Sequence, residues 1–318
     1  MNNFFLIFFQ FFVVICWASE QNLSVGFFSV ANGKSQEDKF SINSIQQREF
    51  FGVYDGHFGS KTAEYLASNL PLLFERYLVT SKIKKEVFEL AFRDAEQNAL
   101  KNNVGGSTAL AAYVGKKNMH IAWVGDTRAV VVDGNGEICF VTQDHDLENK
   151  AEWDRVRKAQ GVIFREITKT GLSGKWRINY LEMTRSIGDK WAKGKDFSTR
   201  RNPQPFRRIK EEYSFLQQWP DTILPDQWAL KALEGQVIAE PEYAEVPLNE
   251  KNRWLILATD GLWNFVKNEE IGTLVKEKAH ENNSVGSIAT ILGKIAIDRG
   301  SEDNITVLII DLWSRKNK

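Results

Sequence analysis

The chain of 318 residues is long enough for one large globular domain or two small ones. Its 41 lysines and arginines balance its 41 aspartates and glutamates, so it lacks the overall basic charge typical of nucleic-acid-binding proteins. Cys16 and Cys139 are the only cysteines. Loss of an N-terminal leader would leave no intrachain disulfide, and stability would then come from the apolar core.

The N-terminal segment has features of a secretory leader. Residues 4–18 are apolar except for Gln10, a run too short to span a bilayer but of the length of a signal-peptide core. Ala18 offers a small residue for cleavage, although no Lys or Arg precedes the run. We therefore expect a signal peptide over residues 1–18 and an exported or secreted mature chain without a membrane span. The alternatives are an uncleaved leader that anchors the chain to a membrane and a buried leading segment.

The remaining chain predicts strands and helices in a mixed order. Apolar runs predict strands at residues 23–31, 37–42, 50–54, 107–114, 119–124, 129–132, 137–141, 177–184, 236–239, 243–246, 254–258 and 305–311. Apolar residues at three- and four-residue spacings predict helices at residues 61–77, 84–100, 148–159, 271–280 and 285–298, with a capping side chain expected at Asn268. Antiparallel strands with helices grouped outside them indicate an α+β architecture.

A carboxylate stands at the end of the predicted strand 50–54. Asp55-Gly56-His57 follows the strand, and a helical pattern begins at Lys61. A carboxylate at the end of a buried strand is costly unless a positive charge meets it, and a divalent cation is the usual partner. Gly56 would let a backbone oxygen approach closely. For this stretch taken alone, a plain strand-to-helix turn is an equal alternative.

Seven further motifs accompany this one in a fixed order. They are Glu37-Asp38, Gly106-Ser107-Thr108-Ala109, Gly125-Asp126-Thr127-Arg128-Ala129, Val141-Thr142-Gln143-Asp144-His145, Thr184-Arg185-Ser186-Ile187-Gly188-Asp189, Ala258-Thr259-Asp260-Gly261-Leu262-Trp263 and Asp303-Asn304-Ile305-Thr306. Over residues 23–312 the series resembles the metal-dependent serine/threonine protein phosphatases of the PP2C (PPM) family.

The resemblance implies both a fold and a reaction. The fold would be a four-layer αββα sandwich, in which helices flank two stacked antiparallel sheets. The reaction would be hydrolysis of phosphoserine and phosphothreonine in partner proteins by a metal-activated water, without a phosphoenzyme, and we expect a monomer. Residues 190–235 stand where the family has a small flap beside the active site, and this flap is enlarged here. Its Lys and Arg residues indicate either a docking surface for acidic or phosphorylated substrate or a solvated loop.

The expected metal site consists mainly of carboxylates. Carboxylates without a His/Cys cluster favour Mg²⁺ or Mn²⁺ over zinc. By resemblance, the metal-binding residues are Glu37, Asp38, Asp55, Gly56, Asp126, Asp260 and Asp303. Asp55 would bridge two ions and Gly56 would contribute its carbonyl oxygen. Asp260 and Asp303 would hold the first ion.

The adjacent acids Glu37 and Asp38 need separate roles, because neighbouring side chains on a strand point to opposite faces. By resemblance, Glu37 reaches the second ion through water and Asp38 supports the turn. Asp126 would serve a weak third site. Asn264 stands where the family usually has an Asp four residues after Asp260, and this change argues against a third ion.

Two residues could act on the substrate directly. His57 follows the bridging carboxylate of Asp55, so its imidazole can reach the leaving oxygen and donate a proton near neutral pH, although a packed turn histidine is the alternative. His145 is expected to hold a turn. The family's phosphate-binding Arg falls at Gly33 here, which makes Lys34 the candidate for substrate phosphate. Lysine lacks the bidentate fork of arginine, so we expect weaker phosphate binding.

Two other functions stay open from the sequence. The first is a catalytically weak phosphatase-like domain that binds phosphoproteins or regulates a partner. Retention of Asp55, Asp260 and Asp303 favours the enzyme, since a binding module does not need all three carboxylates. The second is a hydrolase of small phosphate esters.

Overall fold

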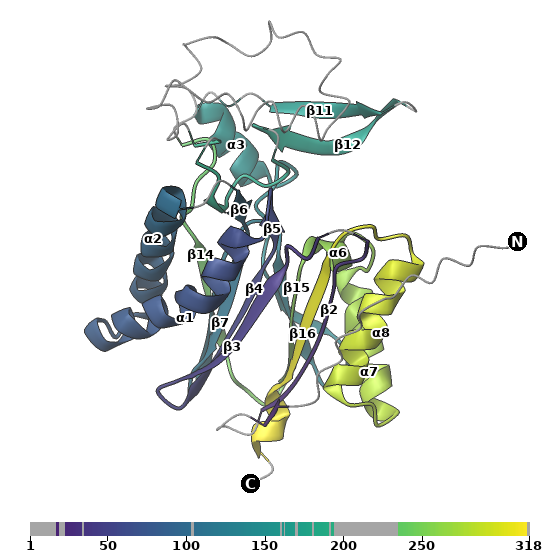
Figure 1. The fold of residues 1–318 in the computed structure, drawn as a ribbon. Coiled ribbons are helices and arrows are strands. Elements are labelled where there is room, and N and C mark those ends of the chain that lie inside the picture. Colours follow the sequence, from purple (N-terminus) through teal and green to yellow (C-terminus); the bar gives the residue numbers. More distant parts are fainter. Residues whose placement is uncertain are drawn as a thin grey trace, which may run out of the picture.

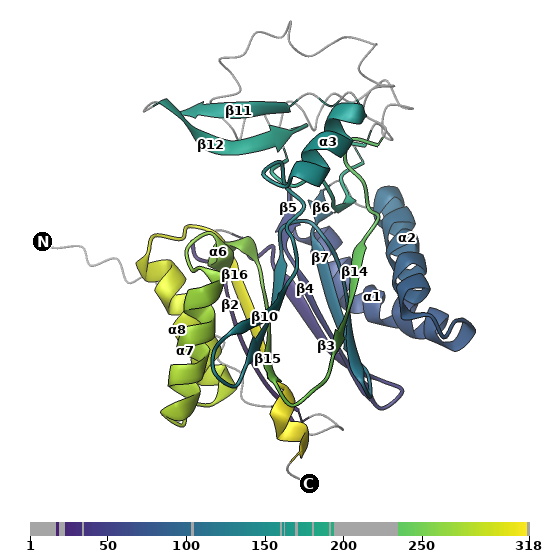
Figure 2. The ribbon, with the colours of Figure 1, turned by 180° about the vertical axis from the view of Figure 1, so that it is seen from behind.

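The computed structural model describes residues 17–18, 23–33, 35–102, 105–159, 161, 163–168, 171–179, 181–190, 192–193 and 235–316. Two antiparallel sheets stack face to face, and helices cover the outer face of each (Figures 1 and 2). This arrangement is the predicted αββα sandwich. Within the described ranges, no helix is both long and apolar enough to cross a membrane.

Each sheet is named after one of its interior strands. The β4 sheet has the order β14 (Glu242–Pro247), β8 (Asn118–Val124), β7 (Ala109–Val114), β4 (Arg48–Tyr54) and β3 (Lys39–Ile45). The β15 sheet has the order β1 (Trp17–Ala18), β2 (Ser24–Val30), β16 (Ile305–Asp311), β15 (Asn252–Ala258), β9 (Arg128–Asp133) and β10 (Ile138–Val141). Neighbouring strands in both sheets are antiparallel throughout.

β4 is apolar along most of its length because both of its faces are covered. Phe51 and Val53 lie in the core between the two sheets, in one cluster with Leu255 of β15. Phe50 and Tyr54 point to the opposite face and lie in the cluster beneath the helices. The alternation is the two-residue period of a strand. A continuous apolar run is therefore the expected pattern for a strand buried on both sides.

One pair of helices covers each sheet (Figure 1). α1 (Lys61–Thr80) and α2 (Lys84–Asn102) lie against the β4 sheet, and α7 (Asn268–His280) and α8 (Val285–Asp298) lie against the β15 sheet. Their buried residues recur every three or four positions, as an amphipathic helix requires. The predicted cap of α7 is wrong, because Asn268 is already helical and its Oδ1 accepts a hydrogen bond from Arg128 instead.

Smaller elements gather at one end of the sandwich (Figure 1). They are β5 (Gly56–His57), β6 (Gly106–Ser107) and β13 (Ile187–Gly188) in a small sheet, α3 (Lys150–Lys158), the hairpin β11 (Ile163–Thr168) and β12 (Gly171–Ile178), and α6 (Asp260–Trp263). A 3₁₀ helix, Leu312–Lys316, follows β16.

Two predicted strands differ from the structure. Of residues 177–184 only Arg177 and Ile178 lie in β12, and residues 181–184 make isolated bridges only, while residues 236–239 contain one bridged residue, Ile238. Leu181 and Val237 of these segments are buried all the same, since they pack in the cluster beneath α3. An apolar run shows that a segment is buried, but a strand also needs a hydrogen-bonded neighbour.

Three predictions fall wholly or largely outside the described residues. Residues 1–16 and 19–22, which contain most of the expected signal peptide, are among these, and so are Lys34 and residues 194–234 of the expected flap. Trp17 and Ala18 pair with β2. Lys193, counted among the basic residues of the flap, is 4% exposed and pairs with Glu96, so it belongs neither to a docking surface nor to a solvated loop.

Candidate metal centre

Strand register brings five of the predicted metal-binding residues to one end of the sandwich. Asp38 precedes β3 and Asp55 follows β4, its antiparallel neighbour. In the other sheet, Asp260 follows β15 and Asp303 precedes β16. Asp126 lies in the connection between β8 and β9, which crosses from one sheet to the other. The site is therefore built by both sheets.

The clustered carboxyl groups resist ionisation. Burial is the main cause that raises the pKa of Asp38 to about 7, and the charges of Asp260 and Asp303 add to it. Burial also raises the pKa of Asp55 well above its usual range, with repulsion from Asp38 next in size. Asp126 is raised in the same way, by burial and then by Asp260. A divalent cation would relieve this repulsion.

Two buried oxygens of the cluster are free to accept a ligand. Oδ1 of Asp38 and Oδ1 of Asp126 have no hydrogen-bond partner among the described residues. A buried acceptor without a partner is costly, and oxygen ligands of this kind suit Mg²⁺ or Mn²⁺. The donor set thus fits the expected ions. The side chains that the structure describes nevertheless include no group of three His, Cys, Asp or Glu residues already arranged to hold a metal ion.

Lys175 on β12 explains part of this arrangement. Its Nζ lies 3.3 Å from Oδ2 of Asp260 and 2.9 Å from Oε2 of Glu182. Burial lowers the pKa of Lys175, but the neighbouring carboxylates, Asp260 first, outweigh burial and raise it. Asn264 donates to the same oxygen of Asp260 at 2.8 Å. Asp260 is therefore paired with a cationic side chain of the protein itself, which the motifs alone did not indicate.

The acidic pair is arranged differently from the expectation. Asp38 is 2% exposed and lies among the other carboxyl groups, where its Oδ2 accepts a hydrogen bond from Thr259 at 2.9 Å. Glu37 accepts a hydrogen bond from the backbone N–H of Gly59 at 2.9 Å. Neither residue is in a strand, since β3 begins at Lys39. Asp38 is thus more central than a supporting role for the turn would require.

Other motif residues hold the acidic turns together. A Cβ on Gly56 would lie 2.6 Å from the carbonyl oxygen of Glu37, so only glycine allows these two turns to approach. Asn304 accepts a hydrogen bond from the backbone N–H of Glu37 at 2.6 Å and donates one to the carbonyl of Ala31 at 2.8 Å. The side chain of Asn304 therefore fixes the segment before β3 against the segment before β16.

Hydroxyl and guanidinium groups fix the turns around Asp55 and Asp126. The backbone N–H of Asp55 donates to Oγ1 of Thr108 at 2.9 Å, and this hydroxyl lies 2.5 Å from that of Thr127. Arg128 donates two hydrogen bonds to Asp144, at 2.9 and 2.6 Å. The motif residues next to the carboxylates thus position them.

Three predicted substrate and turn residues can be compared with the structure. His57 contacts Asp189 through Nε2, at 2.7 Å from Oδ2, a partner that the sequence did not reveal. His145 accepts a hydrogen bond from the backbone N–H of Gly125 at 3.1 Å, in agreement with its expected role in a turn. Gly33 is exposed with φ of +87°, so an arginine at that position would be strained.

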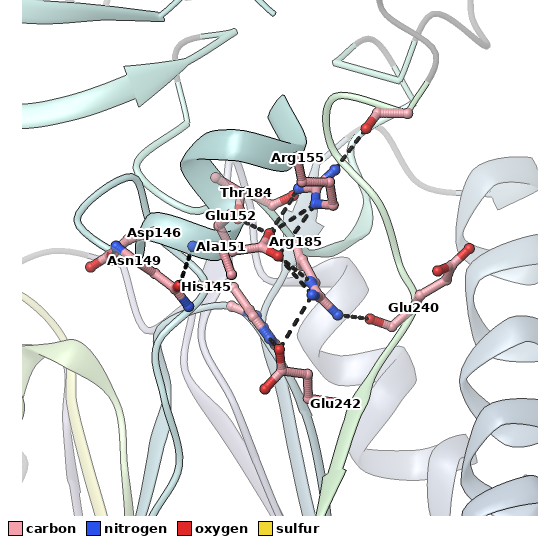
Figure 3. A network of polar contacts seen from close by, with 12 residues as sticks. His145, Asp146, Asn149, Ala151, Glu152, Arg155, Thr184, Arg185, Glu240 and Glu242 are labelled. Atoms are coloured by element: carbon pink, nitrogen blue, oxygen red, sulfur yellow. Dashed lines mark hydrogen bonds and ion pairs between the residues drawn. The ribbon is translucent and has the colours of Figure 1, made fainter. Parts of the chain in front are cut away.

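A buried ionic network supports the site from the side of α3 (Figure 3). Glu152 is 1% exposed and accepts hydrogen bonds from Arg155, Arg185 and Thr184, at 2.8, 2.6 and 2.5 Å. Burial raises the pKa of Glu152, but the hydrogen bonds from Arg185, Arg155 and Thr184 outweigh burial and bring it to about 2. The network ties α3 to the segment that leads to Asp189.

Comparison with known proteins agrees with this geometry. A sequence model described as protein phosphatase 2C matches residues 18–305. The chain belongs to the protein phosphatase 2C family. The class of enzyme predicted from the motifs, a protein serine/threonine phosphatase, is thereby confirmed.

Two curated members of the family, both from Oryza sativa subsp. japonica, give the extent of the relationship. "Probable protein phosphatase 2C member 13, mitochondrial" is 30% identical over 316 residues, which cover 95% of this chain and 72% of that protein. "Probable protein phosphatase 2C 52" is 29% identical over 309 residues, which cover 92% of this chain. The chain spans about half, 52%, of the length of this second relative.

Two solved structures share the fold of this chain. The serine-threonine phosphatase 2C from Toxoplasma gondii has a TM-score of 0.68 at 17% identity, covering 95% of this chain and 98% of that one. A C. elegans sex determining protein has a TM-score of 0.69 at 21% identity, covering 95% of this chain and 67% of that one. At these identities the likeness establishes the αββα architecture.

Proposed function

We propose that this phosphatase 2C family member hydrolyses phosphoserine and phosphothreonine in proteins and depends on Mg²⁺ or Mn²⁺. The observation that supports this most is the convergence of Asp38, Asp55, Asp126 and Asp260, whose pKa values are all raised by burial and by neighbouring carboxylates. A site of this kind is costly to maintain unless cations occupy it. Two ions, when bound, would activate a water and neutralise the phosphoryl group.

The residues of the chain have three tasks in this proposal. Asp38, Asp55, Asp126, Asp260 and Asp303, with the carbonyl of Gly56, would hold the ions. His57, on the turn that follows Asp55, donates a proton to the serine or threonine oxygen as it leaves. The hydrogen bonds of Thr108 and Asn304 keep the turns in register, so that the site is formed before substrate arrives.

The test is hydrolysis of a phosphothreonine peptide by the full chain, with and without Mn²⁺, and by Asp260→Asn. The substitution keeps the shape of the side chain and removes its charge. We expect kcat to fall at least about a hundredfold, equivalent to ~2.7 kcal/mol of transition-state stabilisation. Asp298→Asn, at the exposed end of α8, is the matched control and should leave kcat unchanged.

Two outcomes would contradict the proposal in different ways. Hydrolysis by Asp260→Asn at the wild-type rate, with the same Mn²⁺ dependence, would show that the metal assignment is wrong. No metal-dependent hydrolysis by the wild type would favour the second candidate, a phosphoprotein-binding or regulatory module. One observation favours that candidate: Lys175 and Asn264 both engage Asp260, where a metal ion should bind.

A further inference from the structure

His57 meets a buried carboxylate that the proposed chemistry does not otherwise use. Its Nε2 lies 2.7 Å from Oδ2 of Asp189, a residue that is fully buried. The other ring nitrogen, Nδ1, is buried and has no hydrogen-bond partner within the described ranges. An ionised carboxylate can only accept hydrogen bonds, so the hydrogen in this contact belongs to Nε2. Nδ1 is then the nitrogen left for a ligand.

The backbone at Asp189 adopts a conformation that few residues tolerate. Its φ is +51°, in the left-handed region where residues other than glycine are uncommon. Gly106 lies directly opposite, and a Cβ built there would overlap the Asp189 carboxylate. A strained residue persists only where its surroundings over-determine it, and such residues cluster at functional sites. Only a glycine at position 106 therefore leaves room for the Asp189 carboxylate.

Buried contacts hold the segment that carries Asp189. Ser186 donates to Oδ2 of Asp189 at 2.6 Å. Lys193 donates to the carbonyl of Ser186 at 2.8 Å and pairs with Glu96 of α2, also at 2.8 Å. Glu96 in turn accepts a hydrogen bond from the backbone N–H of Gly188 at 2.8 Å. Glu96 and Lys193 are 8% and 4% exposed, so β13 is fixed by a buried ion pair.

The other side of the segment is fixed by the network around Glu152 (Figure 3). Thr184 and Arg185, which precede β13, both donate hydrogen bonds to Glu152 of α3. The segment that ends at Asp189 is thus held from α2 and from α3. Two independent buried anchors are more than a surface turn needs, and they leave Asp189 little freedom to move relative to His57.

We propose that Asp189 is a positioning residue for His57: it fixes the ring orientation and keeps a proton on Nε2, so that Nδ1 faces the leaving oxygen. This inference rests on the proposed function, in which His57 is the proton donor. Asp189 does not touch the substrate. It acts as the carboxylate of a histidine–aspartate pair does, by fixing the orientation of the ring and the nitrogen that carries the hydrogen.

The proton balance of the step is simple. The bond between phosphorus and the serine or threonine oxygen breaks, and its electron pair goes to that oxygen. The proton on Nδ1 passes to the same oxygen, so the side chain leaves as an alcohol. His57 is left neutral, with its remaining proton on Nε2 and directed at Asp189, while water supplies the new oxygen of the phosphate.

The first test compares two substrates that differ in their need for a proton. A phosphothreonine peptide has a poor leaving group, whereas the nitrophenolate of p-nitrophenyl phosphate leaves without protonation. In Asp189→Asn, we expect kcat on the peptide to fall about 10- to 100-fold, with kcat on p-nitrophenyl phosphate within about twofold of wild type. Asn is chosen because it keeps the side-chain shape and tolerates a positive φ. Asp298→Asn is the control and should change neither rate.

Two further variants separate the possible outcomes. His57→Gln should show the same selective loss, and the double variant should lose no more than His57→Gln alone, because both residues act on one step. Equal losses of Asp189→Asn on both substrates would overturn the positioning role, since a structural defect damages the site for every substrate. If His57→Gln shows no selective loss, His57 is not the proton donor and the inference fails with it.

A second measurement does not depend on activity. The ¹⁵N shifts of the His57 ring, assigned by comparison with His57→Gln, report which nitrogen is protonated in the neutral ring at alkaline pH. We expect the Nε2–H tautomer in the wild type. An Nδ1–H tautomer would overturn the proposal whatever the enzyme assays show, and a wild type without activity but with the Nε2–H tautomer would contradict the proposed function alone.

Discussion

Asp260 pairs with the partly exposed ammonium group of Lys175 and is also proposed to bind a metal ion. Lys175→Gln removes the ammonium group, so Mn²⁺ would no longer compete with it. An exposed ion pair contributes at most about 1 kcal/mol, and the Lys175 side chain is 46% exposed, so we expect Mn²⁺ to bind up to about fivefold more tightly. Titration calorimetry measures the change directly.

Two variants serve as controls for Lys175. Lys175→Arg keeps the positive charge and should bind Mn²⁺ as the wild type does. Lys85→Gln removes a charge from the exposed side of α2 and should also have no effect. Unchanged or weaker Mn²⁺ binding in Lys175→Gln would mean that its ammonium does not compete with the ion.

At the residue scale, the sequence revealed the metal-binding candidates but not their partners. Asp55 was recognisable because it follows an apolar strand directly, and Asp260 because its motif resembles one of the family's. Asp189 was part of a recognised motif, yet its contact with His57 joins residues 132 positions apart and depends on tertiary packing. Lys175 is 85 positions from Asp260, and a lysine on a hairpin has no local pattern that distinguishes it from a solvated one.

At the scale of elements, α3 is anchored by one buried carboxylate. Glu152→Gln keeps the volume of the side chain but removes the charge that faces Arg155 and Arg185. Because this breaks a buried ion pair, we expect the free energy of unfolding to fall by about 3 kcal/mol. Urea denaturation at pH 7 measures the change. Glu148→Gln, in the exposed loop before α3, is the control.

The same substitution gives a pH dependence with a defined direction. The pKa of Glu152 is lowered from 4.5 to about 2 in the folded protein. Its stabilising contribution is therefore fully present above its unfolded pKa of 4.5 and is lost as the pH falls toward 2. The stability difference between wild type and Glu152→Gln should shrink over this window. A difference below about 0.5 kcal/mol at pH 7 would contradict the role of the network.

Elements with clear ends were predicted best. The helix expected at 285–298 and the strand expected at 305–311 match α8 and β16 to the residue. Ser284 caps α8 through a hydrogen bond from the backbone N–H of Ser287, and β16 is buried continuously from Ile305 to Ile310. Of the strand predicted at 177–184 only Arg177 and Ile178 lie in β12, and residues 236–239 form no strand, because burial in an irregular segment produces the same apolar pattern as a strand.

At the scale of the whole molecule, the clustered carboxyl groups at one end of the sandwich make stability depend on pH. Burial raises the pKa of Asp38 from 3.8 to about 7. The folded protein then holds a proton more tightly than the unfolded chain, so the associated stability is fully present below the unfolded pKa and is lost as the pH rises through the folded one. With EDTA present, we expect Tm to fall as the pH rises from about 4 to about 7.

Scanning fluorimetry of three proteins tests this expectation. Asp38→Asn should lose much of the pH dependence of Tm, since its amide does not ionise. Asp298→Asn should retain it. If Tm depends on pH in Asp38→Asn as it does in the wild type, groups other than Asp38 cause the pH dependence.

The crossing of β8 into β9 at Asp126 has a mechanical consequence. The two sheets form separate hydrogen-bonded networks and meet through an apolar layer, whose contacts have no preferred direction. The carboxylates of the two sheets lie close together where the sheets meet at this end of the sandwich. Without a cation, repulsion between the ionised carboxylates favours separation of the two layers at that end. An ion bound by carboxylates of both sheets would cross-link the layers while leaving the hydrogen bonds within each sheet unchanged.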